Sequence, residues 1–295
     1  MRHFITTDDF SNSEILEIFS DAEKFLKHEE RGDELAKKNV MTLFFENSTR
    51  TKSSFEMALK RLGSRVVHLD ISKSSTSKGE TLLDTAYNLK SIGANAFIIR
   101  HSDAGVTYKL AEHLNNKSSV INAGDGAFAH PTQAMLDLFT IMRYFPDPIG
   151  KKIAIVGDIR NSRVANSNIK LLPRFGIGIT LVSPPHFLPK INIKSTNNLN
   201  EVINDVDIIM SLRTQTERHN QQVYSSLKDY AKDFCITEER LKNKNVILMH
   251  PGPVNRNIDI SDGLMNDPRT KILEQVENGV AVRMAILKFL LAGNK

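Results

Sequence analysis

The chain has 295 residues, 40% hydrophobic and 25% charged, which is typical of globular proteins, and its length suits two domains. The single cysteine, Cys235, excludes an internal disulfide and any zinc site built from several cysteines. The formal net charge of +5 favours an anionic partner, and because the basic residues are dispersed, small anionic substrates are favoured over nucleic acid.

The predicted elements alternate between strands and helices. Ser11 and Glu14 form a capping-box pattern before apolar residues at helical spacing, which predicts a first helix. After it, short apolar strands alternate with amphipathic helices, a pattern that indicates parallel sheets covered by helices on both faces. The predicted strands span 40–46, 65–71, 96–100, 119–123, 152–157, 179–183, 207–212 and 246–249. The other predicted helices span 52–62, 80–91, 105–114, 131–144, 162–174 and 271–291.

A domain boundary is predicted in the segment YFPDPIGKK, where two prolines and a glycine precede a new strand. Four predicted strands lie before it and four after it. The prediction is an α/β protein of two doubly wound domains, each a mainly parallel sheet flanked by helices, with the active site in the cleft between them. The first domain is expected to span 1–145 with the C-terminal helix at about 271–295, and the second 146–270.

The segment FFENSTRTKSSFE, residues 44–56, is the strongest local signal. An apolar strand ends in Ser48, Thr49, Arg50 and Thr51, and an amphipathic helix follows. Helix N-termini attract anions, and a guanidinium can hold two phosphate oxygens, so this segment predicts a phosphate site. An ordinary N-cap beside a solvated arginine is the alternative, and the segment alone leaves both open.

Most other predicted strands also end in cations, hydroxyls or amides. Ligands of open α/β sheets bind beyond the carboxyl ends of the strands, so these groups together predict a site for a substrate with several negative charges. The groups are Arg100 and His101, then His130 and Gln133 in GDGAFAHPTQ, Arg160 and Arg163 in GDIRNSR, Arg213, Gln215 and Arg218 in RTQTER, and the HPGP motif.

These motifs resemble the aspartate and ornithine carbamoyltransferase superfamily nearly end to end. STRT with HPTQ identifies the superfamily. The lysine in SSTSKGET, the LRTQTER run and an HPGP motif without cysteine resemble the aspartate carbamoyltransferase branch, whose catalytic chain makes N-carbamoyl-L-aspartate for pyrimidine synthesis. The resemblance implies carbamoyl phosphate and L-aspartate as substrates, with no metal and no organic cofactor.

The resemblance also implies a role for each matching position. The implied catalytic residues are Arg50, Thr51, Lys78, Arg100 and His130. The residues implied to bind carbamoyl phosphate are Ser48, Thr49, Arg50, Thr51, Ser75, Arg100, His130, Gln133, Pro251, Gly252 and Pro253. Those implied to bind aspartate are Lys78, Arg163, Arg213 and Gln215. Lys78 and a serine, either Ser74 or Ser75, are implied to enter the neighbouring subunit's site, which requires a homotrimer or a multiple of it.

The Gly252–Pro253 bond is predicted to be cis, because the family resemblance suggests it and cis is accessible before proline. Arg160, Glu217 and Arg218 are expected to be structural. The histidines without ligand spacing are expected to be structural or on the surface, and Cys235 is expected to be an incidental thiol. These histidines are His68, His101, His113 and His219.

Three alternatives remain at this point. Transfer to ornithine or another amine is disfavoured because the HPGP position has no cysteine. A nicotinamide-dependent oxidoreductase would use KIAIVGD, which lacks the three-glycine fingerprint. A non-catalytic binding protein would need no oxyanion donors. No apolar run reaches the roughly 18–20 residues of a membrane span, and MRHFITTDDF has no signal-peptide core, so a cytoplasmic enzyme without membrane or nucleic-acid partners is expected, with a regulatory chain left open.

Overall fold

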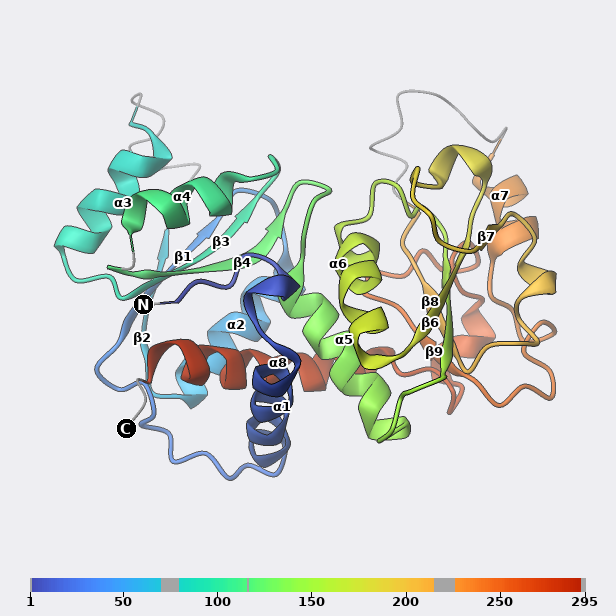
Figure 1. The fold of residues 1–295 in the computed structure, drawn as a ribbon, viewed down its shortest axis with the longest axis horizontal. Coiled ribbons are helices and arrows are strands. Elements are labelled where there is room, and N and C mark those ends of the chain that lie inside the picture. Colours follow the sequence, from blue (N-terminus) through green and yellow to red (C-terminus); the bar gives the residue numbers. More distant parts are fainter. Residues whose placement is uncertain (1, 70–79, 116, 215–225, 293–295) are drawn as a thin grey trace. The chain divides into compact units, whose positions relative to one another are not determined.

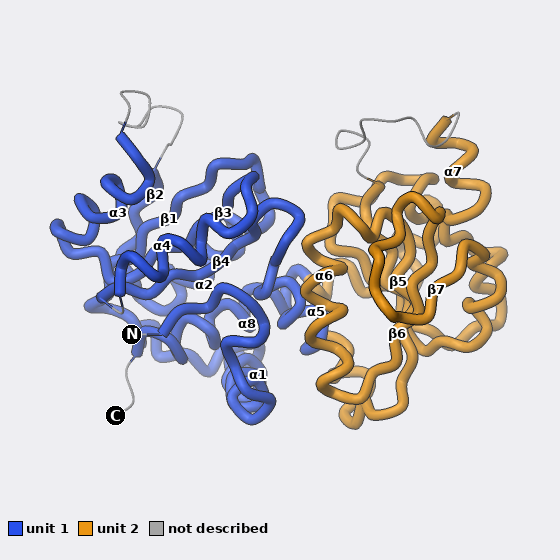
Figure 2. Tube along the Cα trace, turned by 45° about the horizontal axis from the view of Figure 1, so that its top comes forward, with its two compact units in different colours: residues 1–139, 276–295 blue, residues 140–275 orange. Residues whose placement is uncertain are grey.

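The computed structural model describes residues 2–69, 80–115, 117–214 and 226–292. The chain divides into two compact units, the first formed by Met1–Phe139 with Val276–Lys295 and the second by Thr140–Gln275 (Figure 2). The second unit is one continuous segment, whereas the first needs both ends of the chain. Most of the last helix, from Val276 on, therefore belongs to the first unit, even though the 136 residues of the second unit separate it in sequence from the rest of the first unit.

The first unit contains a four-stranded parallel sheet in the order β2-β1-β3-β4. The strands are β1 (Asn39–Phe44), β2 (Arg65–Leu69), β3 (Ala96–His101) and β4 (Ser119–Asp125). The N-terminal segment adds a short parallel bridge, in which Phe4 donates from its backbone N–H to the Val120 carbonyl at 2.8 Å.

Helices cover both faces of this sheet, with α3 and α4 on one face and α1, α2 and α8 on the other (Figure 1). The helices of the first unit and the boundary helix are α1 (Asn12–Leu26), α2 (Thr49–Arg61), α3 (Leu82–Ser91), α4 (Val106–Leu114), α5 (Pro131–Tyr144) and α8 (Ile272–Leu291). Helix α1 begins with the predicted capping box, in which Ser11 accepts from the Glu14 backbone and Glu14 accepts in return.

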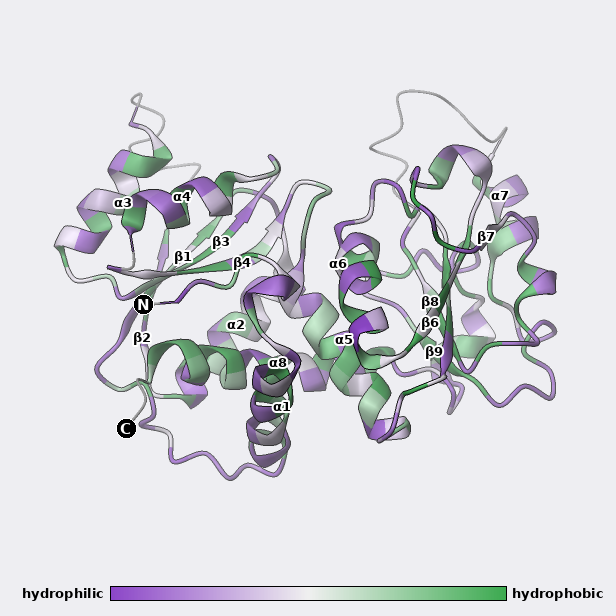
Figure 3. Ribbon diagram, in the orientation of Figure 1, coloured by the Kyte–Doolittle hydropathy of each residue, from purple (hydrophilic) through white to green (hydrophobic). Residues whose placement is uncertain are grey.

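Side chains alternate between the two faces of the sheet along each strand, and one row of apolar side chains packs against α3 and α4. Met41, Leu43, Phe97 and Ile99 from β1 and β3 form a buried cluster with residues of α3 and α4, such as Leu110. Successive strand residues point to opposite faces, so the residues between them face α1, α2 and α8. Figure 3 shows most of helix α8 coloured as hydrophobic, as expected for a helix that is largely buried.

The second unit contains a five-stranded parallel sheet in the order β7-β6-β5-β8-β9. The strands are β5 (Lys152–Val156), β6 (Gly178–Val182), β7 (Ser195–Thr196), β8 (Ile208–Ser211) and β9 (Ile247–Met249). Helices α6 (Arg163–Leu171) and α7 (Leu227–Phe234) lie on opposite sides of this sheet (Figure 1). Tyr230 and Phe234 of α7 join a core that includes Val156, Ile209 and Leu248 from the strands.

The two parallel sheets flanked by helices confirm the predicted fold class, and all eight predicted strands occur within a few residues of their predicted bounds. Helix α2 begins at Thr49 rather than at residue 52, so Ser48 of the STRT motif is its N-cap and the other three residues of the motif lie in its first turn. The helix predicted over 162–174 is α6 followed by a 3-10 turn at Leu172–Phe175. The two-residue strand β7 and helix α7 were not predicted. None of the described helices is long and apolar enough to cross a membrane.

Candidate active site

Most of the predicted site residues of the first unit follow the carboxyl ends of its strands. Because the sheet is parallel, the ends of β1, β3 and β4 lie at one edge, and the STRT turn, Arg100 and the segment before α5 emerge there. Thr51, His130 and Gln133 are all less than 9% exposed. Buried polar groups collected at a sheet edge fit a binding site better than a solvated surface.

The start of α2 carries positive charge where a helix ordinarily favours negative charge. Helices α1, α3 and α7 have an acidic residue in the first turn, namely Glu14, Asp84 and Asp229. The first turn of α2 has none and holds Arg50 instead, and among the described residues Ser48 at its N-cap makes no side-chain capping bond. An arginine there adds to the helix dipole rather than offsetting it, which disfavours the simple capping interpretation and suits an anion site.

Arg100, at the end of β3, is held by the neighbouring strands. Its Nε lies 3.2 Å from a Glu46 carboxylate oxygen, and its Nη1 donates to the Ala123 carbonyl at 3.3 Å. The Arg100 and Glu46 side chains are only 14% and 19% exposed, so their ion pair is mostly shielded from water. The next residue, His101, packs its ring against Phe45 with 4.7 Å between centroids, a structural role as expected.

Gln133 is oriented by a buried carboxylate one turn further along α5. Its Nε2 donates to Oδ1 of Asp137 at 3.0 Å, and Asp137 is fully buried. Since a carboxylate only accepts hydrogen bonds, the amide must turn its NH2 toward Asp137, and this leaves its carbonyl oxygen as the end that can accept from a ligand NH2 group.

Arg283 of α8 lies beneath this region. Its Nη1 donates to Ser54 Oγ of α2 at 2.9 Å and to the Gly279 carbonyl at 3.1 Å, and the guanidinium sits 5.1 Å from the Phe55 ring centroid. Burial lowers the pKa of Arg283 to about 10, with Asp137 opposing that shift. A side chain at Gly279 would meet the guanidinium at 2.7 Å, so the glycine leaves room for it.

The second unit presents two arginines at the carboxyl ends of its strands. Arg163 is the first residue of α6 and is only 7% exposed, and Ser162 caps this helix by accepting from the Ala165 backbone at 3.2 Å. As in α2, the first turn has no acidic residue and carries an arginine. Arg213 follows the end of β8, where Leu212 still donates to the Val156 carbonyl of β5 at 2.8 Å.

The loop from β5 to Arg163 runs close to the end of β8. A side chain at Gly157, whose φ is +122°, would lie 3.1 Å from the Leu212 carbonyl oxygen and 3.3 Å from the Tyr230 hydroxyl. The glycine therefore allows the loop that carries Arg163 and the loop that carries Arg213 to approach each other.

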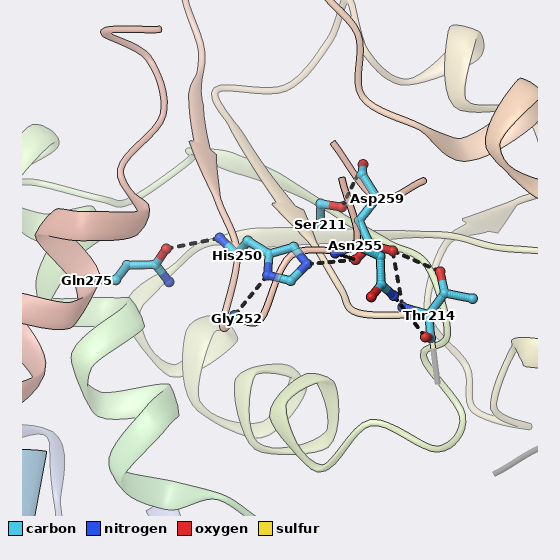
Figure 4. Close-up of polar contacts among 7 residues, drawn as sticks. All are labelled: Ser211, Thr214, His250, Gly252, Asn255, Asp259 and Gln275. Atoms are coloured by element: carbon cyan, nitrogen blue, oxygen red, sulfur yellow. Dashed lines mark hydrogen bonds and ion pairs between the residues drawn. The ribbon is translucent and has the colours of Figure 1, made fainter. Parts of the chain in front are cut away.

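The HPGP turn follows β9 at the same edge of the sheet. The Gly252–Pro253 bond is cis, which confirms the prediction. The Gly252 backbone N–H donates to Nδ1 of His250 at 2.8 Å, and the His250 ring in turn lies 3.2 Å from Asp259, as shown in Figure 4. Asp259 also binds Thr214 and Asn255, so one buried carboxylate connects the β8 and β9 loops.

Several predicted residues fall outside the described part of the chain. These are Ser74, Ser75, Lys78, Gln215, Glu217, Arg218 and His219. Of the others expected to be structural, Arg160 is exposed, His68 binds Thr42 at 2.6 Å, and the His113 ring contacts the Lys109 carbonyl at 2.7 Å. Burial raises the pKa of Cys235 to about 11, which suits an unreactive thiol.

Sequence reasoning did not identify Asp137, Asp259 or Arg283 as part of these networks. Asp137 and Arg283 each interrupt an apolar run, AMLDLF and VAVRMA respectively, and Asp259 lies between two isoleucines in NIDIS. A charge that interrupts an apolar pattern is seldom fully buried unless it is paired, so this interruption was the available signal. Within the described residues, no group of three or more histidine, cysteine or acidic residues could hold a metal ion.

Comparisons with known proteins cover the whole chain. A family model for the aspartate/ornithine carbamoyltransferase carbamoyl-P binding domain matches residues 2–143, and one for the Asp/Orn binding domain matches residues 149–290. The aspartate carbamoyltransferase catalytic subunit of Campylobacter lari is 62% identical over 292 residues, 99% of each chain. The Nitratiruptor protein of the same name is 60% identical over 291 residues, 99% of each chain.

Solved structures of aspartate transcarbamoylases have the same fold as this chain. Aspartate transcarbamoylase from Trypanosoma cruzi in complex with carbamoyl phosphate and aspartate is 32% identical, with a TM-score of 0.88 over 97% of this chain and 96% of that one. The catalytic subunit of M. Jannaschii aspartate transcarbamoylase is 34% identical, with a TM-score of 0.86 over 98% of both chains. The chain belongs to the aspartate/ornithine carbamoyltransferase family.

Proposed function

We propose that this protein transfers the carbamoyl group of carbamoyl phosphate to the amine of L-aspartate, giving N-carbamoyl-L-aspartate and phosphate. The observation that carries the proposal is the pair of helices, α2 and α6, that begin with an arginine and no acidic residue at the carboxyl edges of their sheets. One anion site per sheet suits two anionic substrates. The full-length relatives named for this activity support the same choice.

The first unit is assigned to carbamoyl phosphate. Ser48, Thr49, Arg50 and Thr51 bind its phosphate, with their backbone N–H groups and the Arg50 fork as donors. Thr51, Arg100 and His130 contact the carbonyl oxygen. Gln133 accepts from the carbamoyl NH2, a role supported by the orientation that Asp137 gives its amide.

The second unit is assigned to aspartate, with Arg163 and Arg213 gripping its two carboxylates and Gln215 nearby. The carbonyl groups of Pro251 and Gly252, in the turn completed by Pro253, are further acceptors for the carbamoyl NH2. This division matches the descriptions of the two family models, which assign carbamoyl phosphate to the N-terminal domain and aspartate or ornithine to the C-terminal domain. We retain the expected domain limits, 1–145 with 271–295 and 146–270, as part of the proposal.

The chemistry is a nucleophilic acyl transfer. The aspartate amine attacks the carbamoyl carbon, and negative charge develops on the carbonyl oxygen, where Thr51, Arg100 and His130 stabilise it. Removing one such donor typically costs about 3–4 kcal/mol of transition-state stabilisation. The C–O bond to phosphate then breaks, and the leaving phosphate takes the amine proton. Positioning both substrates removes much of the entropic barrier.

The assembly is proposed to be a homotrimer or a multiple of it, located in the cytoplasm, with Lys78 and Ser74 or Ser75 serving a neighbouring subunit. These three residues lie outside the described part of the chain, and the assignment depends on the family resemblance. The product would enter pyrimidine biosynthesis.

A substrate comparison tests the function. The purified protein is incubated with carbamoyl phosphate alone, with L-aspartate or with L-ornithine, and phosphate and carbamoylated product are both measured. We expect N-carbamoyl-L-aspartate and phosphate in equal amounts, and only with aspartate. Product formed from ornithine instead would support the alternative transferase, and binding of carbamoyl phosphate without turnover would indicate a binding protein.

A further inference from the structure

Asp259 is a fully buried carboxylate whose two oxygens each accept two hydrogen bonds. Oδ1 accepts from the Thr214 backbone N–H at 3.1 Å and from the Thr214 hydroxyl at 2.9 Å. Oδ2 accepts from the Asn255 backbone N–H at 2.8 Å and from Nε2 of His250 at 3.2 Å. Its backbone carbonyl accepts from the Ser211 hydroxyl at 3.2 Å (Figure 4).

These partners belong to two separate strand-end loops. Ser211 ends β8 and Thr214 follows Arg213, whereas His250 and Asn255 flank the Pro251–Gly252–Pro253 turn after β9. Asn255 adds a direct link by donating from Nδ2 to the Thr214 carbonyl at 3.1 Å. Asp259 is therefore the acceptor through which the two loops are held at a fixed separation.

The hydrogen bonds also determine the protonation of His250. The Gly252 backbone N–H can only donate, so Nδ1 of His250, at 2.8 Å, must be an unprotonated acceptor. A neutral imidazole then carries its proton on Nε2, the atom that faces Asp259. The ring thus accepts from the turn on one side and donates to the carboxylate on the other, with its side chain 0% exposed.

We propose that Asp259 is a positioning residue for the transfer reaction, acting through His250 on the HPGP turn and through Thr214 on the neighbouring Arg213. The inference rests on the proposed function, because it matters for catalysis only if the turn holds the carbamoyl group and Arg213 holds an aspartate carboxylate. Displacing one loop relative to the other by even 1 Å would misalign the amine and the carbamoyl carbon, an error that can cost about 100-fold in rate.

Asp259→Asn is the primary test. The carboxamide has one oxygen and one NH2, so the NH2 would face either the two donors at Thr214 or the two at Asn255 and His250. We expect kcat to fall at least about tenfold and the aspartate KM to rise at least about tenfold. Binding of carbamoyl phosphate alone should weaken less than binding of aspartate does, because its phosphate is assigned to the first unit and only its carbamoyl NH2 contacts the HPGP turn. Asp259→Glu keeps the charge and should restore part of the activity.

Two controls separate positioning from general loss of stability. Asp207→Asn makes the same chemical change at the opposite end of β8, where Asp207 accepts from the Lys152 backbone at 2.9 Å and from Lys151 Nζ at 3.2 Å. Val202→Ala removes buried apolar atoms from the core of the second unit. Both should lower the melting temperature and leave kcat and the aspartate KM within about twofold of the wild-type values.

His250→Asn tests the hydrogen-bonded link from Asp259 through His250 to the HPGP turn. An asparagine oxygen can replace Nδ1 as the acceptor for Gly252 but is too short to reach Asp259. We expect the aspartate KM to rise as it does in Asp259→Asn, and the double variant to be little worse than either single variant, because both remove one link. If Asp259→Asn does not fold, Thr214→Val removes a single donor from the same carboxylate and should raise the aspartate KM at least about threefold.

The outcomes distinguish this inference from the proposed function. A wild-type protein that makes no N-carbamoyl-L-aspartate overturns both. The positioning role alone is overturned if the wild-type protein is active and Asp259→Asn keeps kcat and the aspartate KM near the wild-type values, as Val202→Ala should. If Asp259→Asn does not fold, the same result with Thr214→Val overturns it. Fully additive effects of Asp259→Asn and His250→Asn would likewise contradict a shared link.

Discussion

Arg283 donates to Ser54 at 2.9 Å, so the last helix of the chain is bonded to helix α2 one turn beyond Arg50. The two residues are 229 positions apart in sequence, and both are at least nine-tenths buried. The contact fixes the helix whose first turn carries the proposed phosphate site. It also gives a structural reason for the arginine inside the apolar run VAVRMA.

Removing this guanidinium should destabilise the first unit. Arg283→Met keeps most of the side-chain volume but leaves Ser54 and the region around Asp137 without their buried cation, and we expect a loss of about 3 kcal/mol in the free energy of unfolding. Lys288→Ala is the matched control, because Lys288 also lies on α8 but pairs with Asp21 where its side chain is 34% exposed. It should cost less than about 1 kcal/mol. Urea unfolding measures both, and equal losses would contradict the buried role of Arg283.

Arg50 should be essential for turnover but not for folding. Arg50 is exposed at the start of α2, so Arg50→Ala should retain the melting temperature while kcat/KM falls by about 1,000-fold or more, as is typical when a charged donor to the reacting group is lost. Lys60→Ala removes the same charge from the last turn of α2, where Lys60 pairs with Glu56. Steady-state kinetics should show near-normal activity for this control, and near-normal activity of Arg50→Ala would refute the phosphate site.

Arg163 should affect aspartate far more than carbamoyl phosphate. Arg163→Lys keeps the charge but loses the planar fork, so the aspartate KM should rise about tenfold or more while carbamoyl phosphate binding is unchanged. Arg160→Lys, an exposed position in the same loop, is the control and should match the wild type. Steady-state kinetics at saturating carbamoyl phosphate give the aspartate KM, and calorimetry without aspartate gives the affinity for carbamoyl phosphate. Equal weakening of both substrates would argue against the assignment.

Asp267 should contribute to stability above about pH 4 and lose that contribution in acid. The Arg269 side chain lowers the pKa of Asp267 from 3.8 to about 2, so the unfolded state takes up a proton first as the pH falls. The stabilisation is complete above 3.8 and disappears as the pH approaches 2. Partial exposure limits it to about 1 kcal/mol. The free energy of unfolding should differ less between pH 7 and pH 3 in Asp267→Asn than in the wild type. Asp233→Asn, at an exposed position, is the control and should show the same difference as the wild type.

Mixed oligomers test the proposed sharing of sites between subunits. Lys78→Ala and Arg50→Ala chains should each be nearly inactive, yet a mixed trimer would contain sites that draw both intact residues from different chains. Each mixed trimer would contain one such intact site out of three, so subunit exchange between the two variants should restore up to about a third of the wild-type activity per trimer. Two copies of the same variant, mixed identically, are the control. Activity that stays at the level of this control after verified exchange would place both residues in one chain's site.

Much of the fold was predictable because its main elements have strong local signals. Buried parallel strands produce continuous apolar runs, and the helices between them show a 3.6-residue period. Strand β7 was not predicted because Ser195 and Thr196 do not lie in an apolar run, and their pairing with β6 is decided by tertiary context. Helix α7 was not predicted because Tyr230 and Phe234 are its only buried residues, too few to show a helical period.

The candidate site was predictable only in part. Arg50, Arg100, Arg163 and Arg213 stand directly after apolar strands or at the starts of helices, so the sequence places them at strand ends. The carboxylates that orient the site depend on contacts between distant segments, such as Asp259 with Thr214 across 45 positions. No local pattern determines such contacts. The early start of α2 was missed because Ser and Thr are typical of turns as well as of first helical turns.

The position of α8 has a consequence for synthesis on the ribosome. The second unit is continuous over Thr140–Gln275, whereas the first needs Val276–Lys295 as well as its N-terminal residues. The usual order, in which the N-terminal domain matures first during translation, is therefore reversed here. Strands β1 to β4 emerge early but cannot bury the face that α8 covers, and Arg283 can reach Ser54 only after the second unit has been made. The nascent first unit must therefore remain incomplete until α8 has been made.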